Sequence, residues 1–303
     1  MRRQKRMPKI ANQNKGHLSS AEMTAYWRSA YHNISKDHLS REIATEEGID
    51  KALQFEHQYH YPLVGRKVSV RARFFLDEAT RLINTNKYDS CISLASGFSL
   101  LTTCINKNIN QSIRSIKFID TDLREIIDER NKRLDKLFAN NVMSQFKNIH
   151  IKVLDLELAC SNKLSLKKIF NDCNNPIFLI EGVIYFLSSE CVKWLINEIS
   201  LYNNAALMLD YWQEDGVLRS KCFSRIVSDL QGFMKENVVS FFTPGFWSQQ
   251  SFANMMSKFI NQSDIEIMEA EHQYSVIEGE ASQFIDQNQF FPVKLFSGEL
   301  RKK

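Results

Sequence analysis

The stretch "YDSCISLASGFSLLT", residues 88–102, decides the fold. A short apolar run leads into small residues around Gly97, and a second apolar run follows them. This order is typical of a buried strand, a tight turn and the start of a helix, the place where parallel α/β sheets bind nucleotide-like ligands. Phosphate-binding turns contain several glycines, whereas this turn has only Gly97. The stretch therefore predicts a nucleotide-like cofactor that has no diphosphate.

Downstream of Lys87, short apolar runs alternate with amphipathic segments. Such alternation predicts an α/β fold, a mostly parallel sheet with helices on both faces. Residues 213–260 break the alternation and are expected to form one or two inserted helices after the fifth strand. The last two strands, with no full helix between them, are expected to form an antiparallel hairpin at one edge. The predicted strands are 89–95, 115–120, 148–153, 176–181, 205–210, 264–270 and 290–296, and the helices are 97–107, 122–138, 163–172 and 188–202.

The organisation of the remaining chain follows from composition. Residues 1–18, which begin with "MRRQKRMPK", are predicted to be a disordered basic tail. Residues 19–86 have helical spacing of apolar side chains and are predicted to form an N-terminal helical cap. Residues 87–303 then form the α/β domain, with its helical insertion at about 213–260.

Composition also limits the partners. There is no run of about 18 apolar residues, so no membrane partner is expected. The net charge of +4 is modest and no basic stripe interleaved with aromatic residues is present, so nucleic acid is not expected either. The six cysteines form no CxxC pair, which indicates reduced thiols and a cytoplasmic protein. No set of metal-ligating residues with a distant third member is found, and the oligomeric state stays open.

Acidic residues follow the second, third and fourth predicted strands. Because the carboxyl ends of parallel strands meet at one edge of the sheet, these residues are expected to share a site with the turn after the first strand. So many carboxylates would repel a diphosphate, whereas a cationic nucleoside without phosphate, S-adenosylmethionine, suits them. The residues at the four strand ends are Ala95, Ser96 and Gly97, then Asp120 and Asp122, then Asp155 and Leu156, then Glu181.

Each part of this cofactor has a candidate partner. Asp122, with Asp120 beside it, suits the ribose hydroxyls; Asp155 suits the adenine amine and Leu156 the adenine ring, and Glu181 suits the ammonium. The cofactor's carboxylate calls for an arginine, because a guanidinium binds a carboxylate with two parallel hydrogen bonds. Arg71 and Arg73, just before the first strand, are the candidates.

Four segments resemble the leucine carboxyl methyltransferase family of class I S-adenosylmethionine-dependent methyltransferases, which includes relatives of polyketide O-methyltransferases. They are "RARFFLDEA" before the first strand, "LASGFSLLT" at the turn, "FIDTDLREIIDERNKRL" after the second strand and "PIFLIEGVIYFLSSECVKWLINEI" around the fourth. The resemblance covers about residues 66–210. It implies a Rossmann-like fold with a seven-stranded, mostly parallel sheet. It also implies that Arg71 binds the cofactor carboxylate, with Arg73 as second choice, and the same roles for the residues at the strand ends.

The chain departs from the family pattern at the turn. Ala95 stands where the family has its first glycine, and Ser99 replaces an aspartate. Further departures are Leu100 for a threonine, Arg124 for a proline, and Phe186 for a tyrosine that Tyr185 precedes. An added methyl group at Ala95 costs about 1–3 kcal/mol where the site cannot relax.

The sequence thus predicts an O-methyltransferase acting on a small molecule or on a carboxylate, including the C-terminal carboxylate of a protein. An ionised carboxylate needs no general base, and the sequence offers none beyond His272, so the catalytic residues stay unknown. The alternative is a degenerate methyltransferase fold acting as a binding module. A nicotinamide-dependent oxidoreductase is disfavoured because no GxGxxG motif follows the first strand. Four aromatic residues are candidates for the acceptor pocket: Tyr26, Tyr185, Tyr211 and Trp212.

Overall fold

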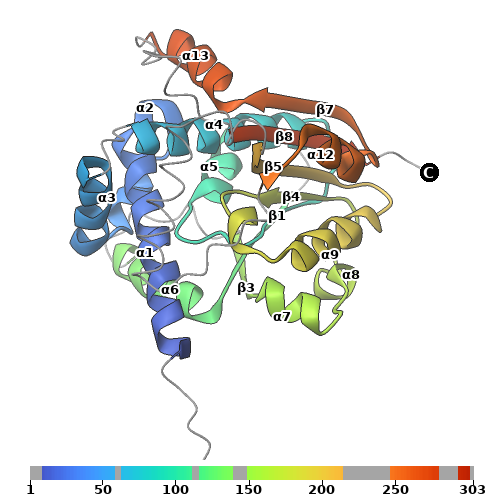
Figure 1. Cartoon of the computed structure of the whole chain (residues 1–303), viewed down its shortest axis with the longest axis horizontal. Helices are drawn as coiled ribbons and strands as arrows, with labels where there is room; N and C mark the ends of the chain where they lie inside the picture. The colour runs from blue at the N-terminus through green and yellow to red at the C-terminus, as the bar shows by residue number, and fades with distance from the viewer. Residues whose placement is uncertain are drawn as a thin grey trace, which may run out of the picture.

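The structure is a computed structural model of the chain, and it describes residues 9–58, 63–110, 116–138, 149–213, 246–279 and 293–300. A twisted sheet runs through the middle of the molecule, with helices on both faces (Figure 1). The strands are β1 (Ser90–Ser93), β2 (Lys117–Asp122), β3 (Ile149–Val153), β4 (Pro176–Ile180), β5 (Ala206–Gln213), β6 (Phe246–Trp247), β7 (Phe259–Glu266) and β8 (Val293–Leu300).

Seven strands follow in the order β3-β2-β1-β4-β5-β8-β7, and the two-residue β6 pairs with β5. The pairings among β1 to β5 are parallel, whereas β8 is antiparallel to both β5 and β7. The predicted α/β fold, a mostly parallel seven-stranded sheet with an antiparallel edge, is therefore confirmed. The strand order changes sides between β1 and β4: β2 and β3 extend the sheet on one side of β1, and β4 and β5 extend it on the other. Open α/β sheets form a ligand crevice at such a point.

The central strands are buried over their whole length, as expected for parallel strands covered on both faces. The described helices after β1 are α5 (Leu101–Asn108), α6 (Arg124–Phe138), α7 (Leu156–Ser161), α8 (Leu166–Ile169), α9 (Ser189–Ser200), α12 (Gln249–Met256) and α13 (Ile267–Ile277), with the 3₁₀ turn η3 (Ile184–Phe186). Side chains fix several of these starts. Asp155 accepts the N–H of Leu158 at 3.0 Å to cap α7, and Ser188 accepts that of Cys191 at 3.1 Å to cap α9.

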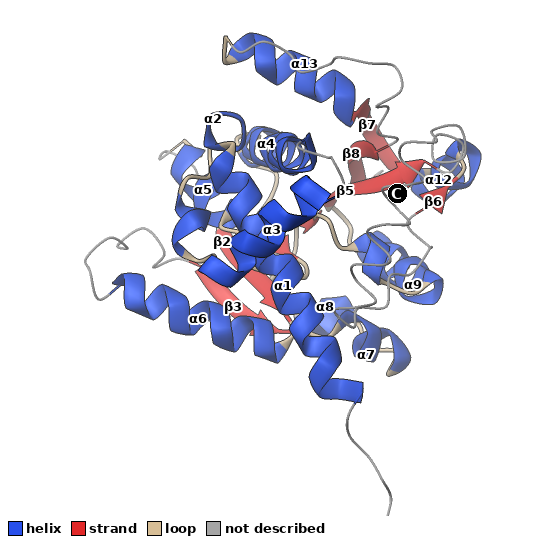
Figure 2. Cartoon of the chain, turned by 60° about the vertical axis from the view of Figure 1, so that its left-hand side comes forward, coloured by secondary structure: helices blue, strands red, loops and turns tan. Residues whose placement is uncertain are grey.

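One prediction for the C-terminal part is wrong. Residues 264–270 do not continue as a strand, because β7 ends at Glu266 and α13 begins at Ile267. A full helix therefore separates the last two strands, although they pair as predicted. The helix α13 lies beside α4 (Leu63–Ile83), as Figure 2 shows. Buried Arg66 of α4 donates to Glu271 of α13 at 2.7 Å and links the two helices. Most of the predicted insertion at 213–260 lies outside the described residues.

The N-terminal part is helical. It comprises α1 (Lys9–Ala30), α2 (His32–Ser35), η1 (Leu39–Glu42), α3 (Glu46–Gln58) and α4 (Leu63–Ile83). The helix α1 begins within the segment that was expected to be a tail; residues 1–8 lie outside the described residues, and the division into tail, cap and α/β domain stays a prediction.

Three contacts hold α1 in place, two of them to the α/β layers and one to α3. Ala21 packs with Phe98 in one buried cluster, Glu22 pairs with Arg133 of α6 at 2.6 Å, and Trp27 packs with Phe55 of α3 in another cluster. These contacts place α1 across the carboxyl ends of the parallel strands.

Candidate functional site

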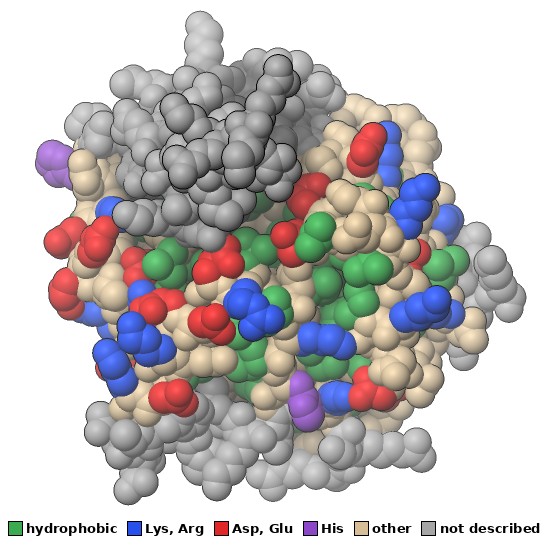
Figure 3. Space-filling model, turned by 90° about the horizontal axis from the view of Figure 1, so that it is seen from below, with side chains coloured by type: hydrophobic (Ala, Val, Ile, Leu, Met, Phe, Trp, Pro, Cys, Tyr) green, Lys and Arg blue, Asp and Glu red, His purple; other side chains and the backbone are tan. Residues whose placement is uncertain are grey.

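A cavity of about 640 Å³ lies at the carboxyl ends of β1 to β4 and beneath α1. Its size falls within the range of pockets that enclose small ligands. Seen from below, acidic and basic side chains surround a group of hydrophobic side chains (Figure 3). The sequence-predicted residues that line the cavity are Arg71, Ala95, Ser96, Gly97, Asp122, Asp155, Leu156 and Glu181.

The turn after β1 keeps a tight shape with a single glycine. Gly97 has φ +56°, and Ala95 has φ +50°, so both residues are in the left-handed region. That region costs an L-residue roughly 1–2 kcal/mol but costs glycine nothing. The N–H of Ser96 donates to the carbonyl of Thr121 at 2.8 Å and ties the turn to β2. The turn therefore holds Ala95 in a conformation that suits a glycine.

Asp122, the last residue of β2, joins this turn from the side. Its Oδ2 accepts the N–H of Gly97 at 2.6 Å and its Oδ1 accepts that of Leu123 at 2.7 Å. Burial raises the pKa of Asp122 to about 6, although the two backbone N–H groups act in the opposite direction. At neutral pH the carboxylate is mostly ionised, and each oxygen keeps a lone pair for a further donor.

Asp120 lies lower in the sheet and does not line the cavity. It forms an ion pair of 2.5 Å with Arg130 of α6, and both side chains are 1% exposed. Arg130 also donates to the hydroxyl of Ser96 at 3.1 Å, and Thr102 donates to Asp120 at 3.1 Å. The structure thus places Asp120 beneath the turn as part of its support, away from the cavity to which the sequence assigned it.

The strand β3 leads into the next part of the wall. Asp155 caps α7, so its carboxylate stands at the cavity side of that helix start, and Leu156 is buried beside it. Glu157 accepts the N–H of Ser188 at 2.5 Å and its hydroxyl at 2.9 Å. These bonds fix the start of α7 against the start of α9.

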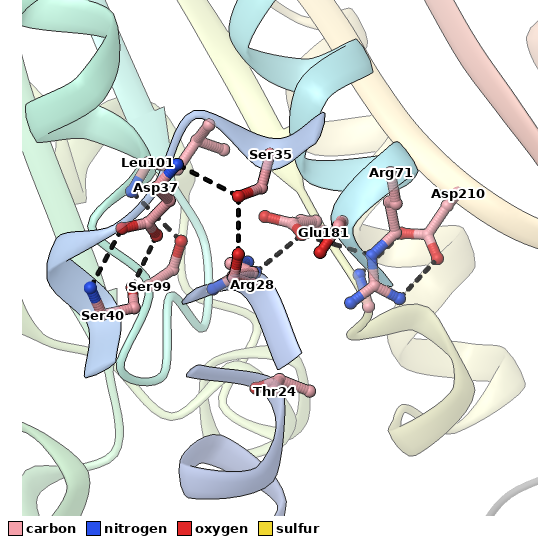
Figure 4. Close-up of polar contacts among 12 residues, drawn as sticks. Thr24, Arg28, Ser35, Asp37, Ser40, Arg71, Ser99, Leu101, Glu181 and Asp210 are labelled. Carbon is pink, nitrogen blue, oxygen red and sulfur yellow. Dashed lines mark hydrogen bonds and ion pairs between the residues drawn. The ribbon is translucent and has the colours of Figure 1, made fainter. Parts of the chain in front are cut away.

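A cluster of four charged side chains forms the opposite end of the cavity (Figure 4). Glu181 Oε1 accepts from Arg28 Nη2 at 2.6 Å and from Arg71 Nε at 3.2 Å. Arg71 Nη1 also reaches Asp210 at 3.3 Å. Burial alone would raise the pKa of Glu181, but the charges of Arg28 and Arg71 outweigh burial and lower it. Glu181 is therefore ionised at neutral pH.

Gly182 makes room for this cluster. It has φ +68°, and a Cβ at this position would lie 2.7 Å from Nη2 of Arg71 and 2.9 Å from its Cζ. Its N–H donates to Asp210 at 2.6 Å, and Tyr185 donates its hydroxyl to the same carboxylate. Arg71 is thereby held between two carboxylates and the backbone of Gly182.

Two members of the cluster were missed from the sequence. Asp210 follows the apolar run of β5, so the rule that selected the other strand ends could have found it. Arg28 comes from α1, which is distant in sequence from every strand end, so the rule that selected the strand ends could not have found it.

Several other candidates lie outside the cavity wall. Arg73 pairs with Asp77 at 2.8 Å and with Glu278 at 2.9 Å. His272 is an exposed residue of α13 rather than the end of a strand.

The four aromatic candidates for the acceptor pocket also fall outside that wall. Tyr185 stacks on Trp212 with ring centroids 4.4 Å apart, and Tyr211 donates to Asp264 at 3.0 Å. Tyr26 packs at the margin of the buried cluster around Trp27.

Comparison with known proteins gives one family and a set of similar folds. The family model described as leucine carboxyl methyltransferase matches residues 17–200. A DUF574 family protein from Streptomyces avermitilis superimposes with a TM-score of 0.60 at 8% identity, over 94% of this chain and 97% of that chain. A Thermobifida fusca protein assigned as a methyltransferase gives a TM-score of 0.57 at 10% identity, over 90% of this chain and 94% of that chain. An S-adenosylmethionine-dependent methyltransferase from Anabaena variabilis gives 0.47 at 12% identity, over 84% and 95%. No curated protein matches.

Proposed function

The chain belongs to the leucine carboxyl methyltransferase family, and on that premise we propose that it is an S-adenosylmethionine-dependent O-methyltransferase that acts on a carboxylate. The acceptor is a small molecule or the C-terminus of a protein. The observation that supports this proposal best is the cavity with carboxylates along one side and an arginine–glutamate cluster at its end. When bound, the cofactor supplies an electrophilic methyl group on a sulfonium.

The nucleoside half of the cofactor fits the side of the cavity formed by β2 and β3. Asp122 is fixed by two backbone N–H groups and still has acceptor capacity for the ribose hydroxyls. Asp155 and Leu156 stand together at the start of α7, which suits the amine and the ring of adenine.

The amino-acid half fits the other end. Glu181 is an ionised acceptor for an ammonium group, and Arg28 and Arg71 beside it are donors for a carboxylate. Charge supports a cationic ligand, because five carboxylates and three arginines are found among the described residues that line the cavity, an excess of negative charge. These side chains are Asp122, Glu125, Asp155, Glu157, Glu181, Arg28, Arg71 and Arg124.

The chemistry of the wall supports a carboxylate acceptor. No His, Lys, Tyr or Cys is found among the described residues that line the cavity. A phenol or an alcohol needs a base to remove its proton, and the carboxylates Asp122, Asp155 and Glu181 of this wall are assigned to the cofactor in this proposal. A carboxylate acceptor is already ionised at neutral pH and needs no base. The protein's contribution is then to align the acceptor oxygen with the methyl group and to exclude water.

A non-catalytic binding module is the second candidate, and the turn after β1 favours it. Ala95 lines the cavity and has a left-handed backbone conformation that suits the family's glycine, and Ser99 stands where the family has an aspartate. Ala95 lines the cavity and is expected to weaken cofactor binding, whereas Ser99 is buried outside the cavity wall.

Calorimetric titration with S-adenosylhomocysteine tests the cofactor assignment. Asp122→Ala is expected to weaken binding about 10–100-fold, since it removes charge-assisted hydrogen bonds. Asp128→Ala, at an exposed aspartate of α6, is the matched control and leaves binding unchanged. No detectable heat with the wild-type protein at millimolar ligand refutes the assignment.

The acceptor class needs a second measurement. Methyl transfer from labelled S-adenosylmethionine to a carboxylate gives an ester, which releases methanol in mild base, whereas an ether does not. Base-stable product contradicts a carboxylate acceptor, and tight cofactor binding without transfer to any carboxylate tested supports the binding module.

A further inference from the structure

The two edges of the sheet differ in how well they are protected against pairing with another chain. At one edge, β7 has exposed polar side chains at residues 261–264, and its pairing with β8 shifts register between Ile260 and Ser263. Polar side chains and such irregularities keep an edge strand from accepting a further strand. At the other edge, β3 pairs with β2 in a regular register, and its sequence "IHIKV" alternates apolar and polar residues.

The apolar side chains of β3 lie on one face of the strand. Ile149 packs against the buried cluster that holds Ile126 and Leu134 of α6, and Ile151 and Val153 share this face because side chains alternate along a strand. The helix covers them only in part, since Ile151 is 38% and Val153 40% exposed. Val153 lines the cavity, where a ligand would cover it, whereas Ile151 lies outside the cavity wall. A ligand in the cavity therefore does not account for the exposure of Ile151.

The backbone of the same residues points away from the sheet. Leu154 donates its N–H to the carbonyl of Asp122 in β2 at 2.8 Å, so the even-numbered residues of β3 direct their backbone groups at β2. Ile149, Ile151 and Val153 direct theirs outward, where β3 pairs with no other strand in the part of the chain that the structure describes. The edge thus presents unpaired donors and acceptors beside exposed apolar side chains.

The lysine of β3 does not shield this edge. Lysine is common on edge strands because its charge opposes pairing with another chain. The ammonium of Lys152 instead donates to the carbonyl of Ile169 and lies 5.3 Å from the ring centroid of Phe170. These contacts hold the charge on the other face of the strand, and the outward backbone groups stay open.

We propose that β3 pairs with β3 of a second copy of this chain, antiparallel and about a two-fold axis, so that the two sheets become continuous. The strand is complementary to itself in one register, in which Ile151 lies opposite Ile151 and Ile149 lies opposite Val153. All these residues have outward backbone groups, so each pair exchanges two hydrogen bonds, and their side chains meet on one face. This self-complementarity assigns the edge to a second copy, because a two-fold contact closes as a dimer.

Analytical ultracentrifugation at about 1–500 µM protein measures the association, which is expected to be weak because a five-residue strand makes a small interface. The mass of the wild type should rise from one chain toward two as the concentration increases. Ile151→Pro removes an outward N–H, and Ile151→Lys places a charge at the centre of the contact. Each should raise the dissociation constant at least about 10-fold. Ser263→Lys places the same charge on the β7 edge, is the matched control and should leave the association unchanged.

Hydrogen exchange of the wild type tests the register without any variant. The N–H of Lys152 points at β2 and should be protected at every concentration, whereas that of Ile151 should gain protection only as the dimer forms. Circular dichroism melting shows whether each variant is folded, and where one is not, the exchange of the wild type decides.

Three results overturn the proposal. One is a wild type that stays a single chain over the whole concentration range. The second is a dimer whose dissociation constant is unchanged in both folded Ile151 variants, which places the interface elsewhere. The third is an amide of Ile151 that exchanges equally fast in the single chain and in the dimer.

Discussion

Ala95→Gly should stabilise this protein, although alanine-to-glycine changes usually destabilise. Ala95 has φ +50°, a conformation that costs an L-residue roughly 1–2 kcal/mol. Glycine relieves that strain but gives the unfolded chain more freedom, which takes back about 0.4–1 kcal/mol. The net expectation is a gain of about 0.5–1 kcal/mol in the free energy of unfolding, or about 1–3 °C in Tm.

The same substitution in a helix gives a matched control. Ala159 lies in α7 and is 1% exposed, so Ala159→Gly loses helix propensity and a buried methyl group. Its expected cost is about 1–2 kcal/mol. Urea denaturation of the two variants beside the wild type should therefore give shifts of opposite sign.

Cofactor affinity provides a second test of the Ala95→Gly variant. Ala95 lines the cavity, and if its methyl group crowds the cofactor, its removal recovers about 1–3 kcal/mol, one to two decades in Kd. Calorimetry with S-adenosylhomocysteine measures the change. A loss of stability as large as that of Ala159→Gly, or an unchanged Kd, refutes the reasoning that Ala95 is strained and obstructs the ligand.

Three further outcomes are expected. Gly182→Ala should lower the free energy of unfolding by about 2–5 kcal/mol, from left-handed strain and from the 2.7 Å approach to Arg71; a loss below about 1 kcal/mol in urea denaturation contradicts this. The pKa of Asp122 is raised to about 6, so S-adenosylhomocysteine should bind more weakly as pH falls through 6, because the ionised form accepts the ribose hydroxyls; the dependence should vanish in Asp122→Asn, and persistence there assigns it elsewhere. The free energy of unfolding of the ligand-free protein should change in the opposite direction, because protonation of Asp122 stabilises the fold and this stability is lost as pH rises through 6. Arg130→Met should cost about 3–5 kcal/mol by leaving Asp120 buried and unpaired, and adding Asp120→Asn should recover part of that loss; strictly additive losses contradict the pair.

The sequence predicts the strands of the parallel part of the fold because most of them contain a short apolar run with a clear end. The same ends locate Asp122, Asp155 and Glu181, since the backbone direction of a parallel strand fixes which residue leaves the sheet at the ligand side. Asp120 shows the limit of this rule. It is two residues before the strand end, and its depth in the sheet sets its partner, which the sequence pattern does not reveal.

Two other features depend on tertiary packing. The segment "IEIMEAEH" after residue 264 alternates like a strand at its start, yet it forms a helix from Ile267 whose Glu271 pairs with Arg66 of α4. Arg28 reaches the cavity only because α1 docks across the strand ends. Neither packing partner is near in sequence, so local spacing cannot reveal either one.

The contact between Arg28 and Glu181 spans 153 residues of chain. Closing a loop of that length costs about 4–5 kcal/mol of chain entropy, and the cost is met before the contact can form. During synthesis α1 leaves the ribosome first, yet its partners at the strand ends arrive only after β4 has been made. Trp27 of α1 can pack early against Phe55 of α3, but the pairing of Arg28 with Glu181 must wait for β4, so the cavity closes late in folding.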